Sequence, residues 1–310
     1  MNRPASAPAV LDWLLDADPS IRWQVLRALI DAPPNEVSRE RARVATEGWG
    51  AAILAAQDAD GRWGGGTFFP RGTGTLDTLF LLYLLGIDPT DAAVRRAIEP
   101  VHEVARWDYD PNLRFWDGEV EPCINGRTVA IGAYFGQDVR GIVDRLIGEQ
   151  MADGGWNCEQ ENGSIRGSFD TTINVLEGLL EYEHSSGTNA DVAAARQRGE
   201  EYLLERRLLH RLSDGEVSQP RWLEAGFPYS WNYDVVRVLD YLRAARAQPD
   251  ERMTEAIEIV AAKRDADGRW PLETAYFEDL QVDLGESVGR PSRWITLRGE
   301  RILGWADRSA

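Results

Sequence analysis

A short tryptophan-containing turn recurs three times along this chain of 310 residues. Residues 57–63 read QDADGRW, residues 150–156 read QMADGGW and residues 264–270 read RDADGRW. In each copy a glycine ends an apolar, helix-like stretch and a tryptophan follows two positions later. A unit that recurs in this way indicates a repeat architecture, in which each unit buries its apolar face against its neighbours.

The first two copies are also followed by similar sequences. Asp77 comes fourteen residues after Trp63, and Asp170 comes fourteen residues after Trp156. Each aspartate precedes a long apolar run, LFLLYLLG in the first copy and INVLEGLLEY in the second. We therefore expect the two aspartates at equivalent starts of buried helices. The third copy does not keep this spacing.

Apolar residues recur with a helical period along most of the chain, and Pro or Gly falls at nearly every junction. The expected helices are 20–31, 36–57, 74–86, 90–106, 121–135, 138–151, 168–184, 190–207, 231–245, 250–264 and 291–306. Some are apolar around most of their surface and should be buried, whereas others are amphipathic and should cover them. Buried helices are expected to start near 22, 74, 121, 168, 231 and 291.

This alternation predicts an all-α fold, a single α/α toroid with about six inner and six outer helices. No linker-like stretch interrupts the pattern, so residues 1–310 are expected to form one domain, with N-terminal helices in 1–35. Residues 208–230 and 271–290 are long for loops and are expected to be lids or irregular loops.

Composition excludes several classes of partner. Thirty-four Lys and Arg against fifty-one Asp and Glu give a net charge of −17, which argues against nucleic acid and anionic membranes. The longest apolar run, 79–87, is too short for a transmembrane segment, and residues 1–19 make a poor signal peptide. Two cysteines do not suggest a disulfide scaffold, so a cytoplasmic location is expected. Twelve tryptophans indicate large flat surfaces in a core or around a cavity.

The Gln-x(3)-Gly-x-Trp turn resembles the repeat of the terpenoid cyclases and the protein prenyltransferase β-subunits. Residues 57–86 and 154–180 are especially similar to a prenyltransferase β-subunit repeat. The likeness covers most of residues 50–185 and extends further only through the rhythm of helical hairpins. It implies a squalene-cyclase-like α/α barrel around a central aromatic-lined cavity that takes an isoprenoid or other apolar ligand. A shared fold does not by itself fix the chemistry.

The resemblance implies one chemistry in which a protonated carboxyl group starts a cyclisation. Asp77 and Asp170 stand where the catalytic aspartate motif of class II cyclases stands. Burial would keep such an acid protonated, and aromatic faces would stabilise the carbocation. However, the chain has no Asp-x-Asp-Asp motif, and an aspartate at a helix start is also an ordinary N-cap. Asp170 is the preferred acid because it is expected beside a group of Cys and Glu residues.

A second chemistry uses zinc, which prenyltransferase β-subunits bind through an Asp-x-Cys pair and a histidine. Glu121 and Cys123 resemble the first element, and Asp170 occupies the expected position of the histidine. Cys158 precedes the neighbouring inner helix and is a further candidate ligand. Thiolates and carboxylates both bind zinc, although a set without imidazole is harder, and buried structural cysteines with a capping aspartate remain the alternative.

The remaining candidates are residues that would contact a substrate. Arginines near the expected rim would suit a diphosphate, although each also fits a surface ion pair. Aromatic and polar residues at starts of inner helices would line the cavity. This set comprises Arg127, Arg290, Arg293, Trp116, Trp231, Tyr233, Asp234 and Trp294.

These patterns leave three functions open. The leading expectation is a terpenoid-cyclase-like enzyme with an aspartate as general acid. The alternatives are a zinc-dependent prenyl- or alkyl-transferase-like protein using Glu121, Cys123 and Asp170, and a non-catalytic toroid that binds a lipid or a partner.

Overall fold

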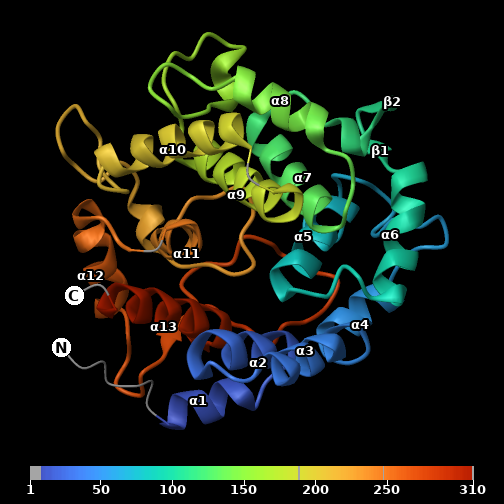
Figure 1. Ribbon diagram of the computed structural model, residues 1–310, viewed down its shortest axis with the longest axis horizontal. Coiled ribbons are helices and arrows are strands. Elements are labelled where there is room, and N and C mark those ends of the chain that lie inside the picture. The colour runs from blue at the N-terminus through green and yellow to red at the C-terminus, as the bar shows by residue number, and fades with distance from the viewer. Residues whose placement is uncertain (1–7, 188, 247, 309–310) are drawn as a thin grey trace.

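The computed structural model describes residues 8–187, 189–246 and 248–308. It is mostly helical, which confirms the all-α prediction (Figure 1). The strands form two short antiparallel pairs, β1 (Arg106–Trp107) with β2 (Asp110–Arg114) and β3 (Trp270–Pro271) with β4 (Pro291–Ser292). Residues 1–7, part of the stretch compared above with a signal peptide, lie outside the described residues.

The α-helices follow the expected segments closely. They are α1 (Pro8–Leu15), α2 (Pro19–Val25), α3 (Pro34–Ala42), α4 (Gly48–Ala55), α5 (Thr75–Leu85), α6 (Ala92–Val104), α7 (Pro122–Tyr134), α8 (Arg140–Gly148), α9 (Phe169–Ser186), α10 (Ala190–Glu205), α11 (Val235–Ala245), α12 (Thr254–Ala262) and α13 (Arg293–Asp307). A short π-helix, η1 (Leu26–Ile30), extends α2. None of the described helices is both long and apolar enough to cross a lipid bilayer.

One expected helix, 36–57, is broken into α3 and α4. The break lies at Gly48, whose φ of +62° favours glycine. A Cβ atom there would lie 1.9 Å from a carboxylate oxygen of Asp18, and the same oxygen accepts a hydrogen bond from the Trp49 N–H at 2.8 Å. The close approach of Asp18, the N-cap of α2, therefore sets where α4 begins.

Two glycines let α7 and α9 pack with their backbones in close contact. A Cβ atom on Gly126 would lie 2.4 Å from the Asn174 carbonyl oxygen, and one on Gly178 would lie 2.3 Å from the Gly126 carbonyl oxygen. No larger residue fits at either position without separating the helices. This contact fixes the spacing between the two helices that hold the candidate site.

Helix contacts connect segments that are far apart in the chain. α5 packs on α7, α7 on α9, α9 on α11, α11 on α13 and α13 on α2, while α4 contacts both α2 and α5. In Figure 1, α6, α8, α10 and α12 lie further from the middle of the molecule than α5, α7, α9 and α11. The apolar helices are thus the more central ones, as their composition predicts.

The tryptophan turn has the same hydrogen bonds in all three copies. Each indole N–H donates to a carbonyl ten residues earlier, from Trp63 to Ile53 at 2.8 Å, Trp156 to Leu146 at 2.6 Å and Trp270 to Val260 at 2.7 Å. Each tryptophan backbone N–H donates to a threonine hydroxyl, of Thr75, Thr172 and Thr296. The third copy is therefore structurally equivalent to the others, although its sequence spacing differs.

These threonines correct the expected equivalence of Asp77 and Asp170. Asp77 follows Thr75 by two positions, whereas Asp170 precedes Thr172 by two. The residue that matches Asp77 on α9 is therefore Asn174. The two aspartates lie at different depths, and they have different surroundings.

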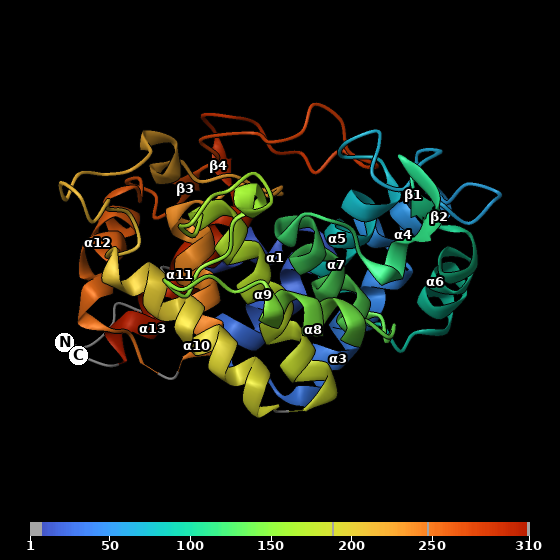
Figure 2. The same ribbon diagram turned by 90° about the horizontal axis from the view of Figure 1, so that it is seen from above.

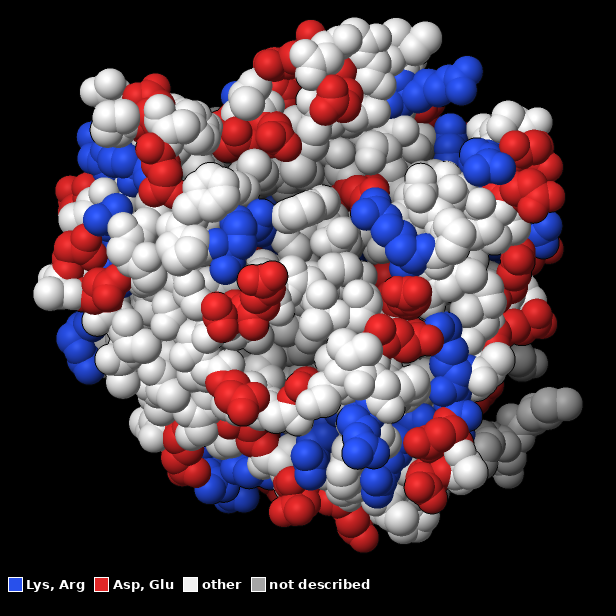
Figure 3. Space-filling model, turned by 180° about the vertical axis from the view of Figure 1, so that it is seen from behind, with Lys and Arg blue, Asp and Glu red and all other residues white. Residues whose placement is uncertain are grey.

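Residues 208–230 and 271–290 are largely irregular, as expected, apart from the 3₁₀ turn η5 (Pro220–Leu223). They are joined by a bridge between Gly226 and Thr274. In Figure 2 both segments lie along one face of the molecule. Figure 3 shows that face, where uncharged residues cover much of the middle.

Candidate functional site

Two cysteines and a glutamate meet where α7 begins. Glu121 is the N-cap of α7, Cys123 lies in its first turn, and Cys158 opens the 3₁₀ turn η4 (Cys158–Gln160). The two Sγ atoms are 3.0 Å apart, and the Cys123 Sγ is 3.6 Å from a Glu121 carboxylate oxygen. The three potential ligand atoms all lie within 4.8 Å of one another. Both cysteines are free thiols.

The two thiols differ in acidity because they share a hydrogen bond. This bond raises the pKa of Cys123, which burial and the charge of Glu121 raise further. The same bond lowers the pKa of Cys158, and the Thr171 hydroxyl, 3.4 Å from its Sγ, lowers it too. The first proton therefore leaves Cys158. A thiolate beside a second thiol and a carboxylate is a donor set that suits a divalent transition metal.

This group opens onto a cavity of about 570 Å³, within the usual range for small-molecule sites. Its walls are mainly apolar and aromatic, with Phe68, Phe69 and Trp231 prominent. Trp231 and Phe69 are 45% and 58% exposed, so the cavity is open to solvent on this side. The arrangement places three potential metal ligands at the edge of an apolar pocket.

The phenylalanines and Arg71 belong to the loop between the first tryptophan turn and α5, and none of them was among the expected contact residues. Arg71 lines the same cavity and lies over the rings of Phe68 and Trp231, at 4.6 and 5.0 Å. The loop is held by Asp108, whose carboxylate accepts three backbone N–H groups of residues 67–69. These bonds join segments about forty residues apart, so no local pattern identified the lining residues of this loop.

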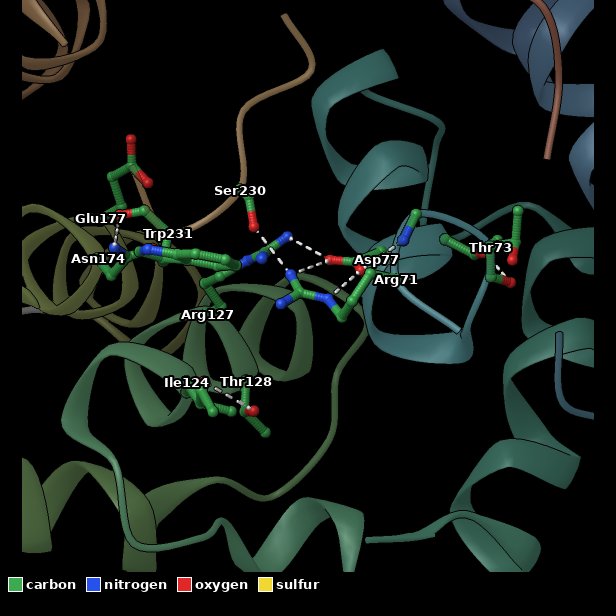
Figure 4. A network of polar contacts seen from close by, with 12 residues as sticks. Arg71, Thr73, Asp77, Ile124, Arg127, Thr128, Asn174, Glu177, Ser230 and Trp231 are labelled. Atoms are coloured by element: carbon green, nitrogen blue, oxygen red, sulfur yellow. Dashed lines mark hydrogen bonds and ion pairs between the residues drawn. The ribbon is translucent and has the colours of Figure 1, made fainter. Parts of the chain in front are cut away.

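Asp77 is buried between two guanidinium groups (Figure 4). Its carboxylate accepts from Arg71 at 2.8 Å and lies 3.1 Å from Arg127, and the Gly72 N–H donates to it as well. Although burial raises the pKa of Asp77, the charges of Arg127 and Arg71 outweigh it and hold the pKa below its ordinary value. This is the opposite of what a general acid requires.

Asp170 is held in place by two other contacts. Arg221 donates to one carboxylate oxygen at 2.9 Å, and the Tyr233 N–H donates to the other at 2.7 Å. The side chain lines the cavity but is outside the group of three ligand atoms. Of the four expected metal ligands, Glu121, Cys123 and Cys158 lie together, whereas Asp170 lies outside this group.

The arginines expected at one rim are dispersed. Arg127 lines the cavity, and none of the described residues accepts a hydrogen bond from its Nε or Nη2 atoms. Burial lowers the pKa of Arg127 to about 10, so it remains charged at neutral pH. Arg293 instead donates to the Trp13 and Asp16 carbonyls, and the side chain of Arg290 is exposed.

Most of the other expected contact residues lie in the packed interior. Trp116 packs against Phe115 at 4.5 Å, and Trp294 stacks on Phe227 at 4.2 Å. The Tyr233 hydroxyl donates to the Leu208 carbonyl at 2.6 Å. Trp231 alone of the expected aromatic residues lines the cavity beside the cysteines.

Asp234 is a buried N-cap whose carboxyl group is a weaker acid than usual. One carboxylate oxygen accepts the Arg237 N–H at 2.8 Å, and no described residue donates to the other. Burial raises the pKa of Asp234 to about 6. Asp234 does not line the cavity beside the cysteines.

No family model matches the chain, and no curated protein matches it.

Proposed function

We propose that the helices close into an α/α toroid of one domain, as the likeness to terpenoid cyclases and prenyltransferase β-subunits implies. The order of contacts from α5 through α7, α9, α11 and α13 to α2, with α4 contacting both α2 and α5, supports this arrangement. The equivalent Trp–Thr hydrogen bonds of the three tryptophan turns support it as well. In such a fold the starts of the inner helices share one end, where the cysteines meet.

We further propose that the chain is a zinc-dependent prenyl- or alkyl-transferase-like protein. The observation that carries this proposal is the convergence of Glu121, Cys123 and Cys158 within 4.8 Å at an apolar cavity. Three protein ligands leave a coordination position for a substrate group, which is the arrangement of catalytic rather than structural zinc sites. When bound, zinc supplies an activated nucleophile at neutral pH by lowering the pKa of a ligand thiol or water.

The residues present fit such a metal. Thiolates and a carboxylate are both accepted zinc ligands, and Cys158 loses its proton more readily than an ordinary thiol. Both cysteines are free, so both are available as ligands.

The rest of the pocket suits a substrate with an apolar body and an anionic leaving group. Phe68, Phe69 and Trp231 offer flat surfaces to an isoprenoid or alkyl chain and exclude water from it. Arg127 lines the cavity wall beside Asp77 and adds positive charge near the oxygens of a departing anion. Arg71, already paired with Asp77, holds this wall in place.

Acid-initiated cyclisation receives less support from the geometry. Asp77 is held ionised by two arginines, and Asp170 accepts hydrogen bonds from Arg221 and a backbone N–H. Asp77 therefore does not keep the proton that a general acid would deliver, and the hydrogen bonds to Asp170 occupy both of its carboxylate oxygens.

Metal analysis of the purified full-length protein, loaded with zinc under reducing conditions and desalted, tests the proposal. We expect about one equivalent of zinc, lost in Cys123→Ser and Cys158→Ser and reduced in Glu121→Gln. Glu159→Gln is the matched control, because Glu159 lines the same cavity outside the ligand group. Less than about a tenth of an equivalent in the wild type would eliminate the zinc site.

Turnover separates an enzyme from a binder. The zinc-loaded protein would be incubated with a panel of prenyl diphosphates and small thiols, and the products identified by mass spectrometry. Formation of a thioether with release of diphosphate, abolished in Cys123→Ser, is the expected outcome. Binding of the prenyl compounds without conversion would favour the non-catalytic toroid instead.

A further inference from the structure

A second cavity, of about 380 Å³, lies at the other ends of the same helices. The cysteine pocket is lined from the first turns of α5, α7 and α9, for example by Leu76, Cys123 and Thr171. The second cavity is lined near the last turns of α5 and α7, by Tyr83 and Tyr134, and further along α9, α11 and α13. The two cavities are therefore separate sites.

The second cavity has an excess of positive charge in an acidic protein. Six arginines line it, against three carboxylates, Glu177, Glu181 and Asp240. The arginines are Arg27, Arg41, Arg237, Arg243, Arg298 and Arg301. The chain as a whole carries −17, so this concentration of guanidinium groups runs against its overall composition. It also differs from the largely apolar cavity that the resemblance implies.

Half of these arginines are already neutralised or hydrogen-bonded by the protein. Arg237 forms two hydrogen bonds to Glu177, at 3.1 and 2.7 Å. Arg41 donates to backbone carbonyls and to the Tyr134 hydroxyl at 2.8 Å. Arg243 donates to Asp240 at 2.8 Å. These three position the wall of the cavity and leave few donors for a ligand.

Arg298 and Arg243 both lie near the carboxylate of Asp240. The Arg298 Nε lies 3.8 Å from the second oxygen of Asp240, beyond hydrogen-bond distance. One carboxylate therefore serves two guanidinium groups, and positive charge remains uncompensated on this side of the cavity.

Arg27 and Arg301 are the groups with donors to spare. Arg27 is an exposed residue that makes no hydrogen bond or ion pair with any described residue and lies over the Trp23 ring at 4.7 Å. Arg301 donates from Nη2 to Gln24 at 2.7 Å, while its buried Nε finds no acceptor in the described part of the chain. Burial of the guanidinium groups and the charges of neighbouring arginines lower the pKa of both, more so for Arg301 because the Arg27 side chain is partly exposed, so an added anion would stabilise the charged forms.

A neighbouring cavity of about 350 Å³ shares three of these arginines, Arg27, Arg243 and Arg301. The guanidinium groups of these three arginines therefore lie between the two neighbouring cavities. An anion with two adjacent charged groups would extend into both cavities. Planar guanidinium groups bind the oxygens of phosphate in bidentate geometry.

We propose that this arginine cavity is a binding site for a compact diphosphate group, held chiefly by Arg27 and Arg301 at the junction of the two cavities. The site does not rest on the zinc proposal, since no residue is common to the two. It gives the chain a second ligand-binding position, at the opposite ends of the helices from the cysteine pocket.

Isothermal titration calorimetry of the full-length protein with sodium pyrophosphate, at about 50 mM salt, tests the proposal. We expect saturable binding, weakened about tenfold or more in Arg27→Gln and in Arg301→Gln. Arg62→Gln, in an exposed pair with Asp60, is the control and should bind as the wild type does. Orthophosphate should bind more weakly than pyrophosphate because it occupies only one of the two cavities.

Three results would overturn the site. These are an absence of saturable binding in the wild type, equal affinities in the wild type and both cavity variants, and tighter binding of citrate than of pyrophosphate. Thermal melting without ligand shows that the variants fold. Arg27→Gln should melt no lower than the wild type, because it removes an unpaired charge among like charges. Zinc content should stay the same in both variants, which separates this test from that of the cysteine site.

Discussion

The Sγ atoms of Cys123 and Cys158 lie 3.0 Å apart although thirty-five positions separate the two residues in the chain. The close packing of α7 on α9 through Gly126 and Gly178 makes this possible, because it brings the start of α7 beside the turn that precedes α9. The hydrogen bond between the thiols then makes them unequal in acidity.

We expect Cys158 to react with iodoacetamide before Cys123 in protein freed of metal with a chelator. The thiolate is the reactive form, and the pKa of Cys158 is lowered while that of Cys123 is raised. Near pH 8 the difference in rate should be about tenfold or more, measured by mass spectrometry of the two peptides. Faster labelling of Cys123 would show that the proton sits on the other sulfur.

Asp77→Asn should destabilise the protein strongly, by about 3–5 kcal/mol, because it leaves Arg71 and Arg127 facing each other without a carboxylate. Urea unfolding at pH 7 measures this change. The folded-state pKa of Asp77 is below its unfolded value of about 3.9, so its stabilising effect is present above pH 4 and is lost as the pH falls through the folded-state pKa.

The control for Asp77 is Asp60, which pairs with Arg62 at 2.7 Å in an exposed turn. Asp60→Asn should change the free energy of unfolding by less than about 1 kcal/mol. If Asp77→Asn instead abolished turnover and left unfolding unchanged, Asp77 would act as an acid, and its assignment as a structural ion-pair partner of the two arginines would be wrong.

The helices of this chain are well predicted by its sequence because their signal is local. Apolar periodicity placed a helix at 74–86 where α5 spans Thr75–Leu85, and at 168–184 where α9 spans Phe169–Ser186. The break at Gly48 could not be predicted, because it depends on Asp18, thirty residues away. The grouping of Cys123 with Cys158 could be expected from the sequence, because Cys123 lies at the start of one inner helix and Cys158 precedes the next.

The prediction from residue spacing that Asp170 is equivalent to Asp77 was wrong for a physical reason. Counting from the tryptophan assumes equal loops, yet the Trp–Thr hydrogen bond spans twelve residues from Trp63 and sixteen from Trp156. The four extra residues turn Asp170 away from the position that Asp77 occupies. Its partners Arg221 and Tyr233 lie 51 and 63 residues further along the chain, and no local pattern encodes such contacts.

Gly178→Ala should lower the free energy of unfolding by about 1–3 kcal/mol, since the new methyl group would lie 2.3 Å from the Gly126 carbonyl oxygen. Gly141→Ala, on the exposed side of α8, is the matched control because nothing lies within 4 Å of its added methyl group. That control should be neutral or stabilising by up to about 1 kcal/mol. Equal losses for both variants would mean that α7 and α9 are not in close backbone contact. Zinc binding by Gly178→Ala should weaken as well, because the spacing of the two cysteines depends on this contact.

Asp234→Asn should make the protein more stable above pH 6 and leave it unchanged near pH 4. Asp234 is buried with one oxygen lacking a donor among the described residues, and burial raises its pKa to about 6 from about 3.9 in the unfolded chain. An acid whose pKa is raised by folding costs stability as the pH climbs from its unfolded to its folded value, because the unfolded chain then binds fewer protons than the native one. Asparagine keeps the N-cap acceptor for the Arg237 N–H without the buried charge.

The gain in the free energy of unfolding should approach about 2–3 kcal/mol at pH 7, measured by urea unfolding of both proteins between pH 4 and 8. A constant difference across this range would show that Asp234 ionises in the native protein as readily as in water, and that Arg237 and Arg298 compensate its charge fully.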